Sequence, residues 1–386
     1  MERREFIKMC TLLGIGVPML QSCDFTTTTP LKKTDKVIII GAGAAGLTAA
    51  YLLNQQEIKV EILEAAPHYG GRMKRTTTFA DFPIPTGAEW LHTERTILNS
   101  IVNNQSVSIK TQTKPYNPKK NYALIDGKKE PLKKLGFTID QKFINATWYD
   151  FYEQYIVPRI KNNIHYKAIV TAIDYSRQKI IVKTTNKEFK ADRVIITVPV
   201  KVLQTNTIKF TPELPVEKAK AIKKVKVWGG CKAFIAFKEK FYPAATGFTN
   251  IPEEQGHKLF YDAAYAQNTQ QHILGLFAVG PVSKPYTQKK GEPLIKHILN
   301  ELDRVYNQKA TPNYQKHIFQ NWTNEPFIKS AYVHYFESWQ TIRQLGKPVQ
   351  DKIFFAGDAY TDGTEWSSVH AAAKAAKRVV AQLLGH

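Results

Sequence analysis

The segment KVIIIGAGAAG at residues 36–46 decides the fold class of this chain. Its first five residues are mostly β-branched and apolar, which is typical of a buried parallel strand, and residues 47–54 have the composition of a helix. In such a strand–turn–helix unit Gly41 permits the tight turn, Gly43 lets a pyrophosphate approach the backbone, and Gly46 lets the helix pack on the strand. The phosphates then lie at the positive end of the helix. The segment therefore predicts a dinucleotide-binding site.

A second predicted strand supports this interpretation. Residues 59–63 form another short run of strand character, and it ends at Glu64. An acidic residue about 20 positions beyond the glycines is where dinucleotide folds bind ribose hydroxyls. We therefore predict that the dinucleotide contacts Gly41, Gly43, Ala45, Gly46 and Glu64.

Length and composition indicate a globular protein. The 386 residues are enough for a large two-domain enzyme, and 43% apolar with 23% charged residues excludes global disorder. No apolar run reaches the roughly 18 residues that a spanning helix needs, which excludes a polytopic membrane protein. Three cysteines are too few for a disulfide framework. No pattern of metal-ligating residues stands out, so we expect no metal.

The charge is unusually positive. The chain has 54 Lys and Arg against 33 Asp and Glu, a net charge of +21. Such a balance suggests an acidic partner such as anionic lipid or nucleic acid, or simply a lysine-rich soluble surface. The basic residues are spread along the chain without an arginine-rich arm or an RNA-binding signature. We therefore expect no nucleic-acid partner.

Residues 1–23 have the features of a targeting segment. A charged start containing Arg3 and Arg4 precedes an apolar stretch over residues 9–20, which predicts a secretory signal peptide. The paired arginines resemble a twin-arginine export signal, and the ending Leu-Gln-Ser-Cys23 resembles a bacterial lipobox. This predicts a lipoprotein exported in the folded state and anchored through Cys23 on the periplasmic side of the bacterial cell envelope. A chance cysteine after a signal peptide is the alternative.

The next motifs indicate which dinucleotide binds. Gly70-Gly71-Arg72 follow the ribose acid closely and resemble the second fingerprint of the FAD proteins that include amine oxidases and phytoene desaturases. Residues 86–92, TGAEWLH, resemble a segment of the flavin-containing amine oxidases that passes beside the isoalloxazine and the substrate. The resemblance implies that FAD contacts Gly71, Arg72, Gly87, Ala88, Glu89 and Trp90, and that Trp90 also faces the substrate, with His92 nearby.

Later segments resemble the same family. A strand-rich stretch over residues 165–203 resembles the return to the FAD domain, where Val170 would present its backbone to the adenine. Residues 352–358 end in Gly357-Asp358 and resemble the closing motif, in which the acid contacts the ribityl or phosphate groups. A helix then starts after Ser368 and Val369, and its positive end would face the flavin and stabilise negative charge there.

Lys232 is the predicted catalytic lysine. It lies in the segment VWGGCKAFIAFKEKFY, residues 227–242, which resembles the family strand whose lysine holds a water against the reactive flavin nitrogen. A lysine in an apolar strand is costly to bury without a partner, so we expect a water or a flavin atom beside its ammonium. Because Lys238 is in phase with it, an exposed lysine face is the alternative.

Two aromatic residues are expected at the substrate. Tyr332 matches the family tyrosine that forms one wall of an aromatic cage. Its predecessor is Ala331, where monoamine oxidases have the cysteine that bonds to flavin, so FAD should be non-covalent. The usual second wall is not matched, because Ser367 and Ser368 occupy that place, and Trp366 is the candidate replacement.

The resemblance covers roughly residues 35–386 and implies an α/β fold of the amine oxidase type. It combines a discontinuous Rossmann-like FAD-binding domain with an α+β substrate domain, after a linker. The expected boundaries are 24–34 for the linker, 35–95, 163–206 and 345–386 for the FAD-binding domain, and 96–162 and 207–344 for the substrate domain.

The implied activity is oxidation of an amine or amino acid to the imine by hydride transfer to FAD, with oxygen as acceptor and hydrogen peroxide as product. An amino acid would need a cation for its carboxylate, and Arg159 and Arg343 are candidates. Two alternatives remain open. One is a desaturase or dehydrogenase that passes electrons to a quinone or another acceptor, and the other is a non-catalytic FAD-holding protein of the cell envelope.

Overall fold

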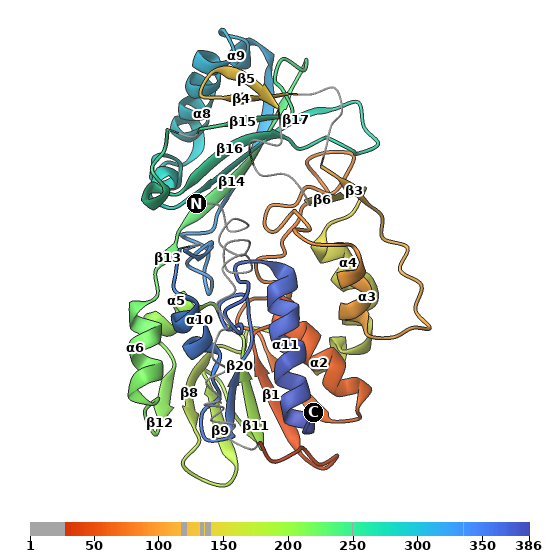
Figure 1. The fold of residues 1–386 in the computed structure, drawn as a ribbon, viewed down its shortest axis with the longest axis vertical. Coiled ribbons are helices and arrows are strands. Elements are labelled where there is room, and N and C mark those ends of the chain that lie inside the picture. Colours follow the sequence, from red (N-terminus) through yellow and green to blue (C-terminus); the bar gives the residue numbers. More distant parts are fainter. Residues whose placement is uncertain (1–27, 117–121, 132–134, 136–139, 249, 335) are drawn as a thin grey trace, which may run out of the picture.

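The chain folds into two lobes that share one cavity (Figure 1). The computed structural model describes residues 28–116, 122–131, 135, 140–248, 250–334 and 336–386. The predicted signal peptide, residues 1–23, lies outside the described residues, and so does the first part of the predicted linker.

A five-stranded parallel sheet forms the centre of the lower lobe in Figure 1, in the order β20-β11-β1-β2-β7. Every neighbouring pair in it is parallel. The side chains of the central strand β1 are almost entirely buried, because both faces of the sheet are covered. The strands are β1 Lys36–Ile40, β2 Lys59–Leu63, β7 Ile164–His165, β11 Arg193–Ile196 and β20 Ile353–Phe355.

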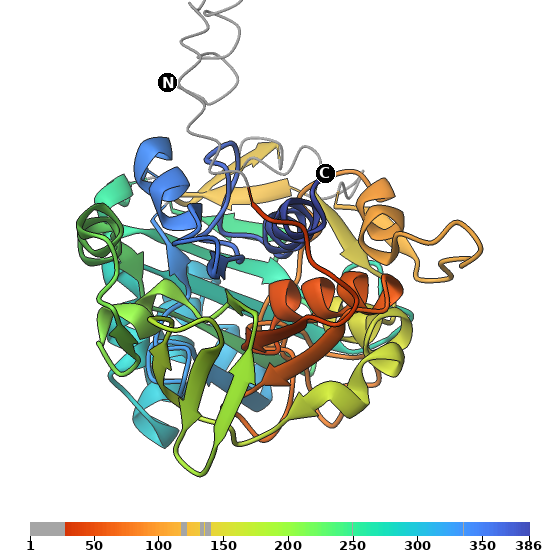
Figure 2. The ribbon, with the colours of Figure 1, turned by 90° about the horizontal axis from the view of Figure 1, so that it is seen from below.

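Four helices pack over one face of this sheet. Figure 2 shows α2 lying along the sheet with α11 beside it. The other two helices contribute apolar side chains such as Leu98 and Phe151 to the same core. The boundary predicted at residue 96 therefore does not coincide with a break in packing, because this core continues through residues assigned to the substrate domain. The helices are α2 Ala44–Gln55, α3 Thr96–Val102, α4 Trp148–Tyr155 and α11 Val369–Leu384.

A small sheet and three helices cover the opposite face. The sheet has the order β10-β9-β8-β12, and its apolar side chains share a second core with the parallel sheet. The elements are β8 Val170–Asp174, β9 Ile180–Thr184, β10 Glu188–Ala191, β12 Lys209–Thr211, α5 Val200–Gln204, α6 Val216–Lys224 and α10 Trp339–Gly346.

The upper lobe is a seven-stranded sheet in the order β18-β14-β17-β16-β15-β4-β5, with α8 and α9 over one face (Figure 1). Its strands are β4 Tyr122–Ile125, β5 Lys128–Pro131, β14 Gly230–Phe237, β15 Ala245–Gly247, β16 His257–Asp262, β17 His272–Val279 and β18 Tyr314–Asn321. Its helices are α7 Lys284–Thr287, α8 Gly291–Val305 and α9 Ala310–Asn313.

The remaining elements are short. Two-stranded ribbons pair β3 Thr113–Pro115 with β6 Gln141–Phe143, and β13 Val227–Trp228 with β19 Tyr332–Val333. The 3-10 turns are η2 Val157–Arg159, η3 Lys161–Asn163, η4 Glu253–Gln255 and η5 Pro281–Ser283. Among the helices that the structure describes, none combines the length and apolar character needed to cross a bilayer.

Candidate active site

One cavity of about 1170 Å³ lies between the two lobes. This exceeds the roughly 300–1,000 Å³ of common small-molecule pockets, so it has room for a dinucleotide and a second molecule. Nearly all the predicted site residues line it, although they come from segments far apart in the sequence. The lining includes Gly41, Gly43, Ala45, Glu64, Gly71, Arg72, Gly87, Ala88, Glu89, Trp90, Val170, Lys232, Tyr332, Gly357, Asp358, Ser368 and Val369, but not Gly46 or Trp366.

The glycine-rich turn has the geometry that its sequence predicts. Gly41 has φ +105°, a conformation that other residues rarely adopt. A Cβ on Gly46 would lie 2.0 Å from the Gly41 carbonyl oxygen, so Gly46 is required for packing beneath the turn. Gly43 is the N-cap of α2, and a Cβ there would meet no atom within 4 Å. The open space at Gly43 therefore lies at the positive end of α2, where a pyrophosphate would fit.

Glu64 lies at the carboxyl end of β2 and joins two backbone turns. One carboxylate oxygen accepts the N–H of Ala42 at 2.6 Å, and the other accepts the N–H of Ala66 at 2.8 Å. Burial raises the pKa of this carboxyl, and the backbone N–H groups partly offset that effect. Val170, at the start of β8, lines the same end of the cavity. Both residues are thus placed for the adenosine half of a dinucleotide.

Arg72 and Asp358 pair with each other. The guanidinium donates to both carboxylate oxygens of Asp358, with one contact at 2.9 Å, and to the Ala331 carbonyl at 2.6 Å. The pair connects the segment after β2 to the segment after β20. Such a fork geometry holds a planar carboxylate firmly. Both side chains line the cavity, so the pair presents a preformed polar wall to a cofactor.

A second helix N-terminus faces the cavity at Ser368 and Val369. The Ser368 hydroxyl accepts the N–H of Ala371 at 3.1 Å and caps α11. Close by, Glu365 pairs with His370 at 3.1 Å and with Lys374. These contacts lower the pKa of Glu365 from 4.5 to about 2, first through the hydrogen bond from His370.

Replacing Glu365 with glutamine should therefore reduce stability in a pH-dependent way. A carboxyl with a lowered pKa in the folded state stabilises the fold above about pH 4.5 and loses that effect as the pH falls toward 2. Because Glu365 is only half-buried, solvent screening reduces the effect to about 1 kcal/mol. Urea denaturation of both proteins at pH 7 and pH 3 measures it. If the difference in unfolding free energy between the two proteins does not shrink at pH 3, the lowered pKa of Glu365 in the folded state is contradicted.

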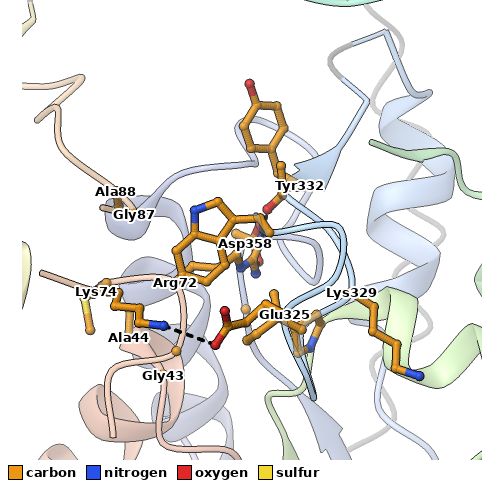
Figure 3. Close-up of a pocket in the computed structure, with 18 of the residues that line it drawn as sticks. Gly43, Ala44, Arg72, Lys74, Gly87, Ala88, Glu325, Lys329, Tyr332 and Asp358 are labelled. Atoms are coloured by element: carbon orange, nitrogen blue, oxygen red, sulfur yellow. Dashed lines mark hydrogen bonds and ion pairs between the residues drawn. The ribbon is translucent and has the colours of Figure 1, made fainter. Parts of the chain in front are cut away.

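The structure adds an ion pair that the sequence did not indicate. Lys74 and Glu325 pair at 3.3 Å, and both line the cavity beside Gly43 and Ala44 (Figure 3). Glu325 also accepts a hydrogen bond from the Gln320 side chain at 2.6 Å. Neither residue lies in a recognisable motif, so only the fold reveals their proximity.

Lys232 is buried, and its ammonium is fully bonded to the protein. It donates to Glu89 at 2.6 Å, to the Pro85 carbonyl at 3.0 Å and to the Gly87 carbonyl at 3.2 Å. These three acceptors require three hydrogens, so the side chain is an ammonium. Burial lowers its pKa, and Glu89 opposes that effect. The sequence predicted a water or a flavin atom as its partner, and the structure adds the Glu89 carboxylate, which no motif indicated.

Lys238, the alternative to Lys232 in the sequence, lies just beyond the end of β14. It is exposed and does not line the cavity. The interpretation of β14 as an exposed lysine face is therefore wrong, because all eight of its residues, Lys232 included, are buried.

Tyr332 lines the cavity with Phe277 as its aromatic neighbour. The two rings are nearly parallel, with an interplanar angle of 16° and centroids 6.4 Å apart, and both face the cavity. Trp366 does not reach it, because its indole N–H donates to the His334 carbonyl at 3.3 Å and its ring packs against the second core. The structure thus offers Phe277, rather than Trp366, as the second aromatic wall.

His92 also lines the cavity and bonds to Asp140 through its Nδ1 atom. No group of three or more His, Cys, Asp or Glu side chains arranged for a metal occurs within the described part of the chain.

Fold and cavity together define a two-lobed dinucleotide-binding protein with a buried lysine in the wall of its cavity. Comparison with protein families identifies which kind of dinucleotide-binding protein this is. A model described as "Flavin containing amine oxidoreductase" matches residues 151–384, more than half of the chain. One described as "NAD(P)-binding Rossmann-like domain" matches residues 39–103. The chain therefore belongs to the family of flavin-containing amine oxidoreductases.

Individual relatives are distant. Probable polyamine oxidase 4 of Arabidopsis thaliana is 22% identical over 84% of this chain and 82% of its own length. Human lysine-specific histone demethylase 2 is 24% identical over 84% of this chain, which covers 50% of that protein. Lysine-specific histone demethylase 1 homolog 3 of Arabidopsis thaliana is 28% identical over 52% of this chain. The match covers 13% of that protein's own length.

A solved structure of redesigned putrescine oxidase shares the fold. Its TM-score is 0.72 at 14% identity, covering 91% of this chain and 99% of that one.

FAD is the cofactor that this family and this cavity specify. The glycine cradle at α2, the ribose acid Glu64 and the second helix end at Ser368 fit a flavin dinucleotide. When bound, FAD supplies the hydride-accepting chemistry, and the protein supplies orientation and electrostatics.

FAD should be released when the purified protein is denatured. Ala331 has no thiol beside the cavity. Among the described lining residues the one thiol is that of Cys231, which is buried with a raised pKa that disfavours the reactive thiolate. Acid precipitation followed by absorbance of the supernatant measures the released flavin. Flavin that remains with the precipitated chain would show a covalent bond.

Proposed function

We propose that the protein oxidises an amine to the corresponding imine, with oxygen reoxidising the flavin. Water then hydrolyses the imine, so that a primary amine, oxygen and water yield a carbonyl compound, ammonia and hydrogen peroxide. The observation that carries the proposal is one continuous cavity, lined by the dinucleotide cradle at Gly43 and by Lys232 and Tyr332. Family membership supports the same reaction class.

The side chains in this cavity suit a neutral amine on an apolar carbon chain. Phe277 and Tyr332 offer parallel ring faces, and Leu259 and Val279 add apolar lining. The ammonium of Lys232 contributes positive charge where the reduced cofactor becomes negative. A protonated substrate cannot readily release a hydride, so the rate should rise with pH as the substrate loses its proton.

The arginines that the sequence suggested for an amino acid carboxylate do not support an amino acid substrate. Arg159 and Arg343, the candidate carboxylate partners, are both exposed and do not line the cavity. Among the described lining residues Arg72 is the one arginine, and Asp358 already occupies its guanidinium.

Anaerobic mixing of the FAD-loaded protein with monoamines, polyamines and amino acids tests the proposal. We expect amines to bleach the flavin absorbance and amino acids to leave it unchanged. Admitting air should restore the absorbance and release peroxide in proportion to the amine consumed. Bleaching without peroxide, reversed by a quinone, would favour the dehydrogenase alternative. No bleaching by any compound would favour a non-catalytic FAD-holding protein.

We further propose that the protein is exported and anchored through a lipid on Cys23. The paired arginines and the Leu-Gln-Ser-Cys ending support this location. Changing Cys23 to serine should release the protein from the membrane fraction, and changing Arg3 and Arg4 to lysine should retain the precursor in the cytoplasm. Cell fractionation with immunoblotting measures both. A mature protein that starts elsewhere and is not membrane-bound would contradict the lipobox.

A further inference from the structure

A second buried lysine lies behind the wall that contains Lys232. Lys142, on β6, is 3% exposed, and its ammonium lies 3.2 Å from one oxygen of Glu89. It also donates to the Ala263 carbonyl at 2.6 Å and lies 5.5 Å from the centre of the Trp90 ring. No sequence motif pointed to this residue, and it is not part of the cavity lining.

Glu89 is shared between the two lysines. One carboxylate oxygen accepts hydrogen bonds from Lys232 and from the Tyr261 hydroxyl, while the other faces Lys142 in an ion pair without hydrogen-bond geometry. Burial alone would raise the pKa of Glu89, but the two lysines hold it below its ordinary value. Tyr261 remains neutral because burial raises its pKa well above 10.

The charges in this cluster do not cancel. Two ammonium groups and one carboxylate leave a net charge of +1, buried where Glu89, Trp90 and Lys232 form the cavity wall. A single lysine paired with Glu89 would give a neutral wall. Buried charge is costly to maintain, so an extra lysine here calls for a function. Reduction makes a flavin more negative, and a fixed positive charge beside it would favour the reduced form.

We infer that Lys142 is a positioning residue of the active site. By pairing with Glu89 it leaves a net positive charge on the part of the cavity wall that contains Lys232, and this charge favours reduction of the bound FAD. This rests on the flavin site of the proposed function but not on its substrate. Lys232 alone, neutralised by Glu89, would supply a hydrogen-bonded dipole rather than a net charge. Lys142 supplies the charge without entering the cavity.

The test is the redox equilibrium of bound FAD against a reference dye, measured anaerobically without any amine. Replacing Lys142 with methionine or glutamine should reduce the equilibrium constant for FAD reduction about tenfold, as expected for the loss of one buried unit charge that does not touch the flavin. Lys142→Arg should stay within about threefold of the wild type, because arginine keeps the charge. Lys218→Met is the control: Lys218 is equally buried but bonds the carbonyls of Leu345 and Lys347, away from the cavity.

Two results would overturn the inference. One is a neutral Lys142 variant that folds, binds FAD and keeps the wild-type redox equilibrium. The other is failure of both neutral variants to fold while Lys142→Arg folds, which would assign Lys142 a purely structural role. Because no amine is used, a failed substrate assignment would leave the redox result unaffected, and the two proposals can fail separately.

Discussion

Replacing Gly43 with valine should abolish FAD binding while leaving the protein folded. The backbone at Gly43 has φ −83°, which valine adopts readily, and a Cβ there meets no atom within 4 Å. The side chain would instead extend into the open space at the start of α2, where we expect the pyrophosphate to bind. Flavin absorbance after reconstitution measures binding, and circular dichroism with thermal melting measures folding.

Gly46 provides the matched control, because the same substitution there should act on folding instead. A Cβ at Gly46 would lie 2.0 Å from the Gly41 carbonyl oxygen, so even Gly46→Ala forces the turn and the helix apart. We expect that variant to be poorly folded, with FAD loss as a consequence. Normal FAD content in a folded Gly43→Val protein would show that the pyrophosphate lies elsewhere.

Replacing Lys232 with methionine should slow flavin reduction, reoxidation by oxygen, or both, by one to a few orders of magnitude. The ammonium lines the cavity and holds the Pro85 and Gly87 carbonyls in place, so its loss removes charge and disturbs the wall. FAD should remain bound, because the Lys232 ammonium bonds Pro85, Gly87 and Glu89, and not Gly43 or Glu64. Rapid-mixing absorbance of each half-reaction measures the effect.

The variant should also remain folded, which the position of Lys142 explains. When Lys232 is removed, Glu89 retains Lys142 as its counter-ion and Tyr261 as a donor, so no carboxylate is left unpaired. The two carbonyls that lose their donor would cost about 1–3 kcal/mol each. Lys238→Met, which changes an exposed lysine outside the cavity, should have almost no effect on either half-reaction. Equal, near-wild-type rates for both variants would refute a catalytic role for Lys232.

Much of the cofactor half of the site could be predicted from the sequence, because its motifs are local. The strand, turn and helix at residues 36–55 follow from apolar runs and glycine spacing within one short segment. Glu64 was placed by its distance along the chain from those glycines, and it does lie at the end of β2. Backbone geometry over a few residues determines such motifs, so they can be read without the tertiary structure.

The substrate half was less predictable. Trp366 was expected as the second aromatic wall, because it lies just before Ser367 and Ser368, where the family has that aromatic residue. Its indole N–H instead donates to the His334 carbonyl, and Phe277 is the ring that faces Tyr332. Phe277 lies on β17, which no motif identifies, and it reaches the site only because β17 pairs with β14. Residues of α3 and α4 share the core of the parallel sheet, because amphipathic segments pack wherever apolar surface is available.

The sequence by itself determined the strand–turn–helix unit of the dinucleotide cradle and the family, and it singled out Lys232 as the candidate cation. Only the tertiary structure decided which partners that cation has. Glu89, Lys142 and Tyr261 come from a loop, β6 and β16, and they meet Lys232 where the two lobes are in contact. Charge–charge interactions depend on distance through a buried, low-dielectric interior, and sequence separation carries no information about that distance.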